Sequence, residues 1–519
     1  MTDYDYIIAG GGTAGCVLAA RLSEDPAVRV LLLEAGSAEP VPAMLVPGAW
    51  PGLIGSAADW AGITTAQAGA GPLPYPRGRG LGGSGAINAM AHVRGHHAVY
   101  DAWAAGGAAG WAHEDLLPYF KRSEHAEGRD PALRGTSGPV RVAPVPEASR
   151  HPAAVALAGA LCALGCPVTA DLSGTRQEGV AWPDLAIWEG RRVSPAGAYL
   201  LPALGRANLT VLTGCLVTRL LISGGQCTGA GYLRDGVPRQ ARAAAGVIVC
   251  AGAIGSPQLL MLSGIGPAAR LRERGIDPVA DLPGTGANLQ DHPIAMACYT
   301  CAVPLPRSQH NHGETYSALS TPLAGAWPDL HIFPILLPVA PPGLQPPAGG
   351  FALVASAVAP ASRGTVRLRS ADPLAAPLID PGFLREPADL DRLEAGLAMI
   401  RAAAAGTAFA RLGATEAHPG PGTRGGGGLR DWIRRTVSSY YHPAGTCQIG
   451  PRPDDGAVVD PELRVHGIGG LRVADASVMP LIPNAHPNAT VLAIAERAAD
   501  LITGRQPGRE QPQAAPRGH

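Results

Sequence analysis

Two histidines in turn-rich sequence near the C-terminal end are the side chains best suited to proton chemistry. His442 lies in the segment YHPAGT (441–446), and His486 lies in the segment NAHPN (484–488). Histidine titrates near neutral pH, so either ring can act as a fixed proton acceptor. The N-terminus carries a dinucleotide-binding pattern. The sequence therefore predicts a proton acceptor beside a redox cofactor.

The N-terminal pattern is a glycine turn between an apolar strand and a helix. Gly10, Gly12 and Gly15 form GxGxxG after the strand 4–9 and before a helix through 16–22. The first glycine permits the turn, the second lets a pyrophosphate approach the backbone, and the third packs helix against strand. The helix N-terminus attracts phosphate groups. Glu34 ends a second strand over 28–33, where its carboxylate can accept hydrogen bonds from ribose hydroxyls.

Two further glycine clusters follow, GRGLGGSGAINAM (78–90) and AGAIGSPQLLMLSGIGP (251–267). Four glycines within 80–85 bring the backbone close to something flat or charged. Asn88 is the nearby polar side chain with both donor and acceptor capacity. Taken alone, an ordinary glycine-rich surface loop explains this cluster equally well. The segment 251–267 predicts a strand, a glycine turn, a helix that begins at Ser-Pro, and a glycine stop.

Together these segments, with NLQDHP (288–293), closely resemble the glucose–methanol–choline (GMC) oxidoreductase family over residues 4–503. The resemblance implies a Rossmann-like α/β FAD-binding domain, interleaved with an α+β substrate domain built on an antiparallel sheet. The expected segments are 1–150, FAD-binding (first part); 151–195, substrate-domain insertion; 196–300, FAD-binding (second part); 301–440, substrate-binding domain; 441–503, FAD-binding C-terminal part with the histidine pair; and 504–519, a disordered tail.

The same resemblance implies roles for individual residues. His442 is expected to be the catalytic base, and His486 the partner that orients the substrate oxygen. The residues expected to bind FAD are Gly10, Gly12, Thr13, Ala14, Gly15 and Glu34 at the ADP half; Val217, through its backbone, at adenine; Gly82, Gly83, Ser84 and Asn88 at the isoalloxazine; Asp475 and Ala476 at the ribityl-pyrophosphate; and Asn488 at the pyrimidine edge. Some members attach FAD covalently through a histidine in the second glycine cluster. The matching position here is Ile87, so non-covalent FAD is expected.

The implied reaction is oxidation of a primary alcohol to an aldehyde. A base takes the hydroxyl proton and flavin N5 takes the hydride. The same site could act on an aldehyde hydrate. The electron acceptor is dioxygen or a quinone-type carrier, and the sequence does not select between them. Two other readings stay open: a non-redox FAD enzyme (a hydroxynitrile lyase or a fatty acid photodecarboxylase) and a non-catalytic flavin-binding protein.

Several residues near the expected substrate site have no assigned role. Tyr441, just before the expected base, either lines the pocket or packs. A choline-type substrate would need a carboxylate or an aromatic cage, for which Trp60 and Glu314 are the candidates without a pattern to select them. Three histidines are interpreted as lid or surface residues rather than catalytic ones: His92, His96 and His97.

Composition excludes several other classes. The 41 basic and 41 acidic residues cancel, so neither nucleic acid nor a charged membrane surface is an expected partner. Nine scattered cysteines without a CxxC pair argue against a disulfide framework and a zinc site, so no metal is expected. No signal peptide and no apolar run long enough for a membrane span are recognised, and a cytoplasmic location is expected. The oligomeric state is not indicated.

Overall fold

The first of two large sheets is built around the expected βαβ unit. The computed structural model, which describes residues 4–423 and 427–505, has β1 (Tyr4–Ala9), α1 (Thr13–Leu22) and β2 (Val30–Leu33) in that order. The strand order is β10-β2-β1-β13-β12-β11, and β24 pairs with β13. The other strands are β10 (Leu209–Leu212), β11 (Cys215–Ser223), β12 (Gln226–Arg234), β13 (Val237–Val249) and β24 (Leu471–Val473).

This sheet combines two kinds of pairing. The parallel part of the sheet contains β10, β2, β1 and β24 together with the C-terminal part of β13. The antiparallel part is a meander formed by β11, β12 and the N-terminal part of β13. β2 is buried at all four positions, as expected for a parallel strand covered on both faces. The carboxyl ends of the parallel strands are where such sheets bind ligands.

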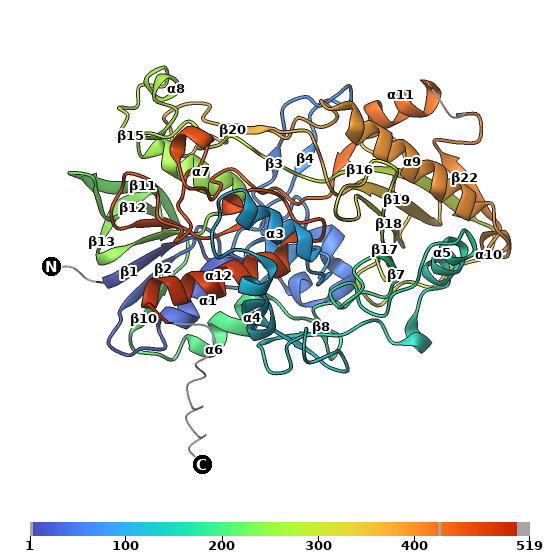
Figure 1. Cartoon of the computed structure of the whole chain (residues 1–519), viewed down its shortest axis with the longest axis horizontal. Coiled ribbons are helices and arrows are strands. Elements are labelled where there is room, and N and C mark those ends of the chain that lie inside the picture. The colour runs from blue at the N-terminus through green and yellow to red at the C-terminus, as the bar shows by residue number, and fades with distance from the viewer. Residues whose placement is uncertain (1–3, 424–426, 506–519) are drawn as a thin grey trace, which may run out of the picture.

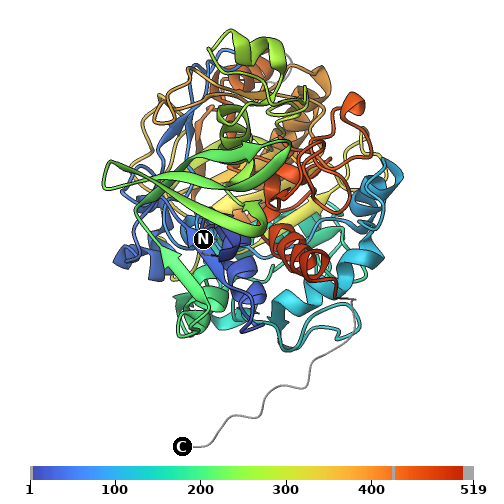
Figure 2. The same cartoon turned by 90° about the vertical axis from the view of Figure 1, so that its left-hand side faces the viewer.

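The last helix lies beside the first. α12 (Pro487–Thr503) packs against α1 and α4 (His113–Ser123), and both views show it beside α1 (Figures 1 and 2). Glu496 of α12 is fully buried and ties these helices together. Its carboxylate pairs with Arg21 and Arg122, each at 2.8 Å, and accepts a hydrogen bond from Tyr199 at 2.8 Å. The C-terminal segment therefore returns to the dinucleotide-binding unit.

The second large sheet is antiparallel. Its order is β22-β16-β19-β18-β17-β7, with β23 beside β16, and α9 and α5 pack on one face (Figure 1). The strands are β7 (Gly179–Ala181), β16 (Pro293–Cys301), β17 (Tyr316–Leu319), β18 (Leu330–Ile335), β19 (Phe351–Ala357), β22 (Ala414–His418) and β23 (Ser438–Ser439). The associated helices are α5 (Pro152–Ala163), α9 (Pro387–Ala404), α10 (Thr407–Ala410) and α11 (Gly427–Thr436).

Side chains alternate between the two faces of this sheet, and each face packs into its own hydrophobic core. On β16, Ala297 belongs to the core beneath the helices, whereas Met296 points to the opposite face. Met296 and Phe333 share a row there because both pair with Val354. Since neighbouring residues of a strand face opposite sides, one sheet supports the helix layer and presents a second apolar wall. Tyr440 packs on that second wall.

The mixed architecture confirms the expected fold class. The boundaries of the predicted segments stay a prediction, and residues 506–519 of the expected tail lie outside the described residues. Within the described ranges, the helices lack the combination of length and apolar character needed to cross a bilayer. The remaining elements are α2 (Ser84–Ile87), α3 (His97–Ala105), α6 (Leu201–Ala203), α7 (Gly252–Leu262), α8 (Ala268–Arg272), β3 (Gly62–Ile63), β4 (Pro74–Tyr75), β5 (Glu124–Ala126), β6 (Val140–Val142), β8 (Ile187–Trp188), β9 (Arg191–Arg192), β14 (Ile265–Gly266), β15 (Ala280–Asp281), β20 (Thr365–Arg367) and β21 (Leu378–Asp380), with short 3-10 and π turns between them.

Candidate active site

The first glycine turn joins β1 to α1, and its glycines are required by close backbone contacts. Gly10 has φ +111°, and a Cβ there would lie 2.6 Å from the Cys250 carbonyl oxygen. A Cβ on Gly15 would lie 1.9 Å from the Gly10 carbonyl oxygen. Thr13 and Ala14 are the first two residues of α1. The turn therefore places backbone amides at a helix N-terminus, which suits a pyrophosphate.

Glu34 joins this turn to the second glycine cluster. Its buried carboxylate accepts hydrogen bonds from the backbone amides of Gly11 (2.7 Å), Gly36 (2.8 Å) and Gly80 (3.0 Å). Burial raises the pKa of Glu34, and these three amides oppose the shift. An ionised carboxylate has about four acceptor positions, so about one remains for a ribose hydroxyl. The residues present fit the ADP half of FAD.

The second glycine cluster lies directly on the first. The Gly82 amide donates to the Gly11 carbonyl at 2.8 Å. Gly83 has φ +53°, and a Cβ there would approach Gly12 Cα to 2.7 Å. The structure thus brings together two glycine segments that lie about 70 residues apart in the sequence.

Three more predicted residues of this region have local partners. Ser84 begins α2, and its Oγ accepts a hydrogen bond from the Gly78 amide at 3.1 Å. Asn88 Oδ1 accepts a hydrogen bond from Arg192 Nη1 at 2.8 Å. Ile87 is buried in an apolar cluster between them. Its hydrocarbon side chain has no nucleophilic atom.

The remaining FAD candidates lie on three different elements. Asp475 caps α7: its buried carboxylate accepts hydrogen bonds from the Gly252 amide (2.8 Å) and the Ser256 hydroxyl (2.5 Å). Burial raises the pKa of Asp475, and the Ser256 bond opposes the shift. The next residue, Ala476, accepts a hydrogen bond from the Gly445 amide at 3.1 Å. Val217 lies in β11 opposite Tyr232, away from these contacts.

Asn488 links the two ends of the chain. Its Oδ1 accepts a hydrogen bond from the Thr13 hydroxyl at 2.9 Å. Because Thr13 begins α1 and Asn488 lies in the first turn of α12, this bond fixes the N-terminus of one helix against the other. His486, two residues before Asn488, is the residue that precedes α12. His486 is thereby tied to the glycine turn.

The two predicted catalytic histidines face each other within a larger group of rings. The ring centroids of His442 and His486 lie 5.2 Å apart, at 73°. His292 Nδ1 lies 3.0 Å from His442 Nδ1, with the rings edge to face. The Tyr440 hydroxyl lies 3.0 Å from His486 Nε2. We call His292, His331, His442 and His486, with Tyr316 and Tyr440, the histidine cluster.

Tyr440 and Tyr316 connect the members of this cluster. Tyr440 stacks on His442 with centroids 4.2 Å apart, and its other face stacks on Phe333 at 4.6 Å and 9°. The Tyr316 hydroxyl contacts His331 Nδ1, and the Tyr316 ring lies 5.1 Å from that of His486. Burial raises the pKa of both tyrosines, so both stay protonated at neutral pH.

Burial also keeps the imidazoles of the cluster neutral. It lowers the pKa of His292 and of His486 to about 3. It lowers the pKa of His442 and His331 well below the ordinary value, and neighbouring histidines add to the effect for both. A neutral imidazole keeps one nitrogen lone pair, so each ring of the cluster is unprotonated and presents an acceptor nitrogen at neutral pH.

Asp291 holds the backbone of His442. Its Oδ1 accepts from the His292 and His442 amides (2.8 and 2.9 Å), and its Oδ2 accepts from the hydroxyls of Tyr75 (2.7 Å) and Ser439 (2.5 Å). Burial raises the pKa of this carboxyl group, and the hydroxyl donors oppose the shift. Four donors use all of its acceptor positions.

The residue before His442 has a strained backbone. Tyr441 has φ +65°, a conformation that bulky side chains rarely adopt. Its amide donates to Ser439 Oγ at 2.7 Å, and its carbonyl accepts from Arg77 Nη2 at 2.6 Å. The surrounding hydrogen bonds therefore fix a sharp turn that aims His442 into the cluster.

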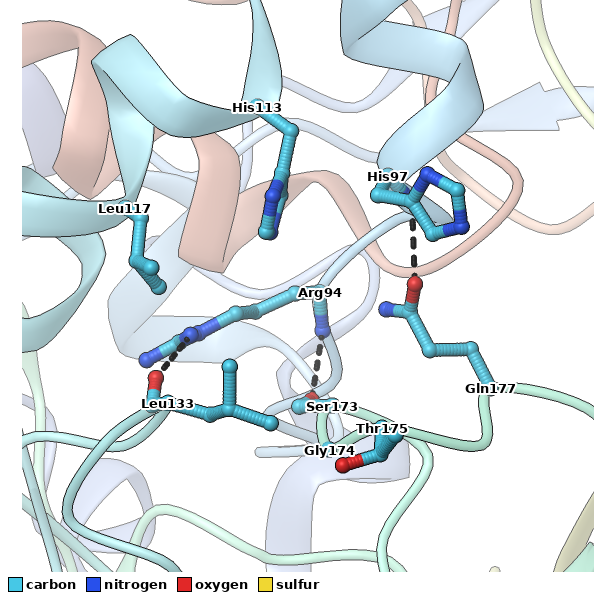
Figure 3. Close-up of a pocket in the computed structure, with 9 residues that line it drawn as sticks. All are labelled: Arg94, His97, His113, Leu117, Leu133, Ser173, Gly174, Thr175 and Gln177. Carbon is cyan, nitrogen blue, oxygen red and sulfur yellow. Dashed lines mark hydrogen bonds between the residues drawn. The ribbon is translucent and has the colours of Figure 1, made fainter.

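A cavity of about 250 Å³ lies near the cluster and contains none of the predicted site residues (Figure 3). The Arg94 side chain runs across the middle of the view, and His113 points toward it from above. Gln177 Oε1 accepts from the His97 amide at 2.9 Å. Arg94 and Gln177 also line a smaller space of about 10 Å³ that reaches Tyr316 and His331. The cavity thus adjoins the cluster through shared lining residues.

Sequence reasoning missed several members of the site. His292 and Asp291 lie in the segment NLQDHP, which was noted without a role for either residue. His331 and Tyr316 lie on strands, where a polar residue on an otherwise apolar face was the available signal. The surface interpretation of His92 was wrong. This ring is buried, and its Nε2 lies 2.9 Å from Glu124 Oε2.

Metal binding is not indicated by the geometry. Within residues 4–423 and 427–505, no group of three or more His, Cys, Asp or Glu side chains is arranged to hold a metal ion. The four histidines of the cluster contact one another and tyrosines instead.

Comparisons with known proteins identify the family of this chain. Family models of GMC oxidoreductases match residues 4–294 and 360–495. The chain is 37% identical to the mitochondrial choline dehydrogenase of Homo sapiens, covering 97% of this chain and 90% of that protein. It is also 37% identical to the oxygen-dependent choline dehydrogenase of Sinorhizobium medicae, covering 97% and 96%.

Solved structures extend the likeness to the whole fold. Pyridoxine 4-oxidase from Mesorbium loti superposes with a TM-score of 0.91 at 35% identity, covering 97% of this chain and 100% of the other. A fungal aryl-alcohol oxidase superposes with a TM-score of 0.85 at 26% identity, covering 97% and 99%. FAD is the cofactor that such neighbours imply. The chain belongs to the GMC oxidoreductase family of flavoproteins that act on alcohols.

Proposed function

We propose that the protein oxidises a primary alcohol to an aldehyde with non-covalently bound FAD. The observation that supports this most directly is the pairing of His442 with His486, 5.2 Å apart, beside residues that suit FAD. Gly445, three residues after His442, bonds Ala476, and Asn488, two residues after His486, bonds Thr13. Choline and pyridoxine, after which relatives are named, are both primary alcohols.

FAD would be held by the two stacked glycine segments, by Glu34, and by the end of the sheet where β13 leads into α7. When bound, it would supply the hydride acceptor. Ile87 offers no atom for a covalent link, which supports non-covalent binding.

His442 would take the proton of the substrate hydroxyl. Its Nδ1 faces His292 Nδ1, so Nε2 is the atom left for the substrate. His486 Nε2 is engaged by Tyr440, whereas its buried Nδ1 has no partner among the described residues. A buried polar atom without a partner is costly unless a ligand satisfies it. His486 Nδ1 would orient the substrate oxygen.

The test is anaerobic reduction of the purified, FAD-loaded protein by a panel of primary alcohols, followed by admission of air. We expect bleaching of the flavin by at least one alcohol, and a fall of about 10²–10⁴-fold in its rate in His442→Ala. His418→Ala is the matched control. It removes a histidine that also precedes proline and that contacts the Gln345 carbonyl instead of the cluster.

The outcomes separate the alternatives. Rapid recovery in air identifies an oxidase, and slow recovery identifies a dehydrogenase that uses a quinone-type carrier. Flavin that stays oxidised with every alcohol would favour a lyase, a photodecarboxylase or a non-catalytic flavoprotein. Equal rates in His442→Ala and wild type would remove His442 from the mechanism.

A further inference from the structure

Arg192 is a buried arginine whose positive charge has no counter-charge within residues 4–423 and 427–505. It ends the short strand β9. Other buried arginines pair with carboxylates: Arg94 and Arg134 both pair with Glu124, at 2.5 and 2.7 Å. Burial lowers the pKa of Arg192 to about 10, and no charged group of the described residues contributes to this shift. The guanidinium is therefore a cation at neutral pH and stands without an ion pair.

The hydrogen bonds of Arg192 go to neutral oxygens. Its Nε donates to the Met44 carbonyl at 2.8 Å. Its Nη1 donates to the Asn88 carbonyl at 2.6 Å and to Asn88 Oδ1 at 2.8 Å. Its Nη2 is buried and has no partner among the described residues. Burying an unpaired charge destabilises a folded protein, so this arrangement calls for an explanation other than the stability of the fold.

The contact with Arg192 fixes the side-chain amide of Asn88. Asn88 Oδ1 accepts from Arg192 Nη1 and also from the Met90 amide, at 3.0 Å. Two donors at this atom identify it as the oxygen of the amide group. The NH₂ group then lies on the other side, where it donates to no acceptor in the described part of the chain. Arg192 thus holds Asn88 with a free donor pointing away from these contacts.

Asn88 lies between the glycine turns and the substrate domain. It follows α2 directly, and α2 begins one residue after Gly83. A Cβ on Gly83 would lie 2.7 Å from Gly12 Cα, in the turn that suits the pyrophosphate. The carbonyl of the next residue, Ala89, accepts a hydrogen bond at 2.7 Å from Asn311 in the loop between β16 and β17. If FAD is bound, its flavin ring belongs at this junction of the two domains.

A positive charge at this junction has a chemical use. In the proposed reaction, a base takes the hydroxyl proton of the alcohol and the flavin takes the hydride. The products are an aldehyde, a protonated base and a reduced flavin that carries one negative charge. Because charges interact more strongly in a buried site than in water, a fixed guanidinium would stabilise that negative charge. The flavin would supply the counter-charge that Arg192 lacks.

We propose that Arg192 is a positioning residue that orients the Asn88 amide toward the flavin and stabilises the negative charge that the flavin gains on reduction. This inference rests on the proposed function, because it takes FAD as the cofactor. It gives a role to a residue outside the histidine cluster and the glycine turns.

Sulfite tests this proposal without any alcohol. Its sulfur lone pair forms a bond to N5 of oxidised flavin, and the ring takes up negative charge. The measurement is the Kd for sulfite, from the loss of visible flavin absorbance in the FAD-loaded protein. Arg192→Gln keeps a donor for Asn88 and loses the charge, so we expect this Kd to rise at least about tenfold. Arg191→Gln is the matched control. Arg191 precedes Arg192 in the same strand but is exposed, and its replacement should change the Kd less than about twofold.

Two further variants separate charge from folding. Arg192→Lys keeps the positive charge, and its Kd for sulfite should stay within about threefold of wild type. Asn88→Asp keeps Arg192 and places a carboxylate beside it. The new ion pair would neutralise the buried charge and support the fold, so we expect a folded protein whose Kd for sulfite rises at least about tenfold.

The outcomes distinguish this inference from the proposed function. An FAD-loaded wild type that forms no sulfite adduct, or an unchanged Kd in Arg192→Gln and Asn88→Asp, would overturn the inference alone. Equal rises in Arg192→Gln and Arg192→Lys would overturn the role of the charge, and an equal rise in Arg191→Gln would overturn its assignment to Arg192. A wild-type protein that does not bind FAD would refute the proposed function and this inference with it.

Discussion

His292 Nδ1 lies 3.0 Å from His442 Nδ1, so a single proton is shared between two neutral imidazoles. The Pro483 carbonyl lies beside His292 and opposes the lowering of its pKa, whereas His292 Nε2 forms no hydrogen bond within the described residues. With Nδ1 turned to His442, we assign the His292 proton to Nε2, so that His292 Nδ1 is the acceptor. His442 accordingly donates from Nδ1 and keeps a lone pair on Nε2, which is the tautomer that a base requires.

Replacing His292 by glutamine should therefore slow flavin reduction without abolishing it. Gln can still accept a hydrogen bond from His442 Nδ1, whereas His292→Phe cannot. We expect a loss of about 3–10-fold for Gln and about 10²-fold for Phe in the rate of anaerobic reduction, with flavin content unchanged. Equal losses in the two variants would show that His292 fills space and does not set the tautomer.

The buried imidazole of His292 also makes stability depend on pH. The unfolded chain binds a proton here below about pH 6.5, while the folded protein, with a pKa of about 3, does not. Protons therefore favour unfolding, and the free energy of unfolding falls as pH drops from 6.5 toward 3. The share of His292 between pH 7 and pH 5 is about 2 kcal/mol. Urea unfolding at both pH values should show a smaller fall in His292→Gln than in wild type.

The same depressed pKa values predict the acid side of the activity profile. His442 must be neutral to accept a proton, and burial lowers its pKa well below the ordinary value. We expect kcat/KM with a neutral alcohol to stay level as pH is lowered through 6.5, provided that FAD remains bound. An apparent pKa near 6.5 in this profile would mean that the base is a solvated histidine.

Glu34 offers a test of the cofactor site. Glu34→Gln keeps the shape of the side chain. It removes the carboxylate charge that accepts hydrogen bonds from the amides of Gly11, Gly36 and Gly80. Hydrogen bonds to a charged group contribute about 1.5–3 kcal/mol, so we expect FAD affinity to fall about tenfold or more. The measurement is the Kd for FAD by flavin fluorescence. Glu24→Gln, whose partners are Arg21 and Arg505, should leave that Kd unchanged.

The sequence predicted the local parts of the site better than the assembled ones. The turn around Gly10 follows from glycine spacing, because strand, turn and helix are adjacent in the chain. His442 and His486 were singled out by residue type and sequence context, and their separate roles were assigned through the family resemblance. Their contacts with His292 and Tyr440 were not, since these depend on a second sheet meeting the first. The spacing of residues along the chain does not show how the two sheets pack against each other.

Burial accounts for two residues, Glu34 and His92, whose surroundings were not predicted from the sequence. The expectation that Glu34 would serve ribose hydroxyls did not include its three backbone donors, because the second glycine cluster returns to it from residue 80. His92 was interpreted as a lid or surface residue for a similar reason: its partner Glu124 lies 32 residues further along the chain. A polar residue in an irregular segment gives no sign of burial until its partner is known.

Asp291 positions His442 through the backbone, and its replacement should separate activity from stability. Asp291→Asn leaves one acceptor oxygen in place of two, so about two of its four hydrogen bonds are lost. We expect the free energy of unfolding to fall by about 3–6 kcal/mol, because about two hydrogen bonds to a buried charge are lost. With Tyr441 no longer fixed at φ +65°, His442 would turn away, and flavin reduction should slow by about 10²-fold.

The matched control is Asp389→Asn on α9. Asp389 is fully buried and accepts hydrogen bonds from the amides of Ala361 (2.8 Å) and Ser362 (2.9 Å). These partners are distant in the sequence from His442 and His486. Its replacement should cost similar stability, and the rate of flavin reduction should stay within about twofold of wild type at a temperature where both variants are folded. If both variants lost activity in proportion to stability, Asp291 would be a structural residue without a positioning role.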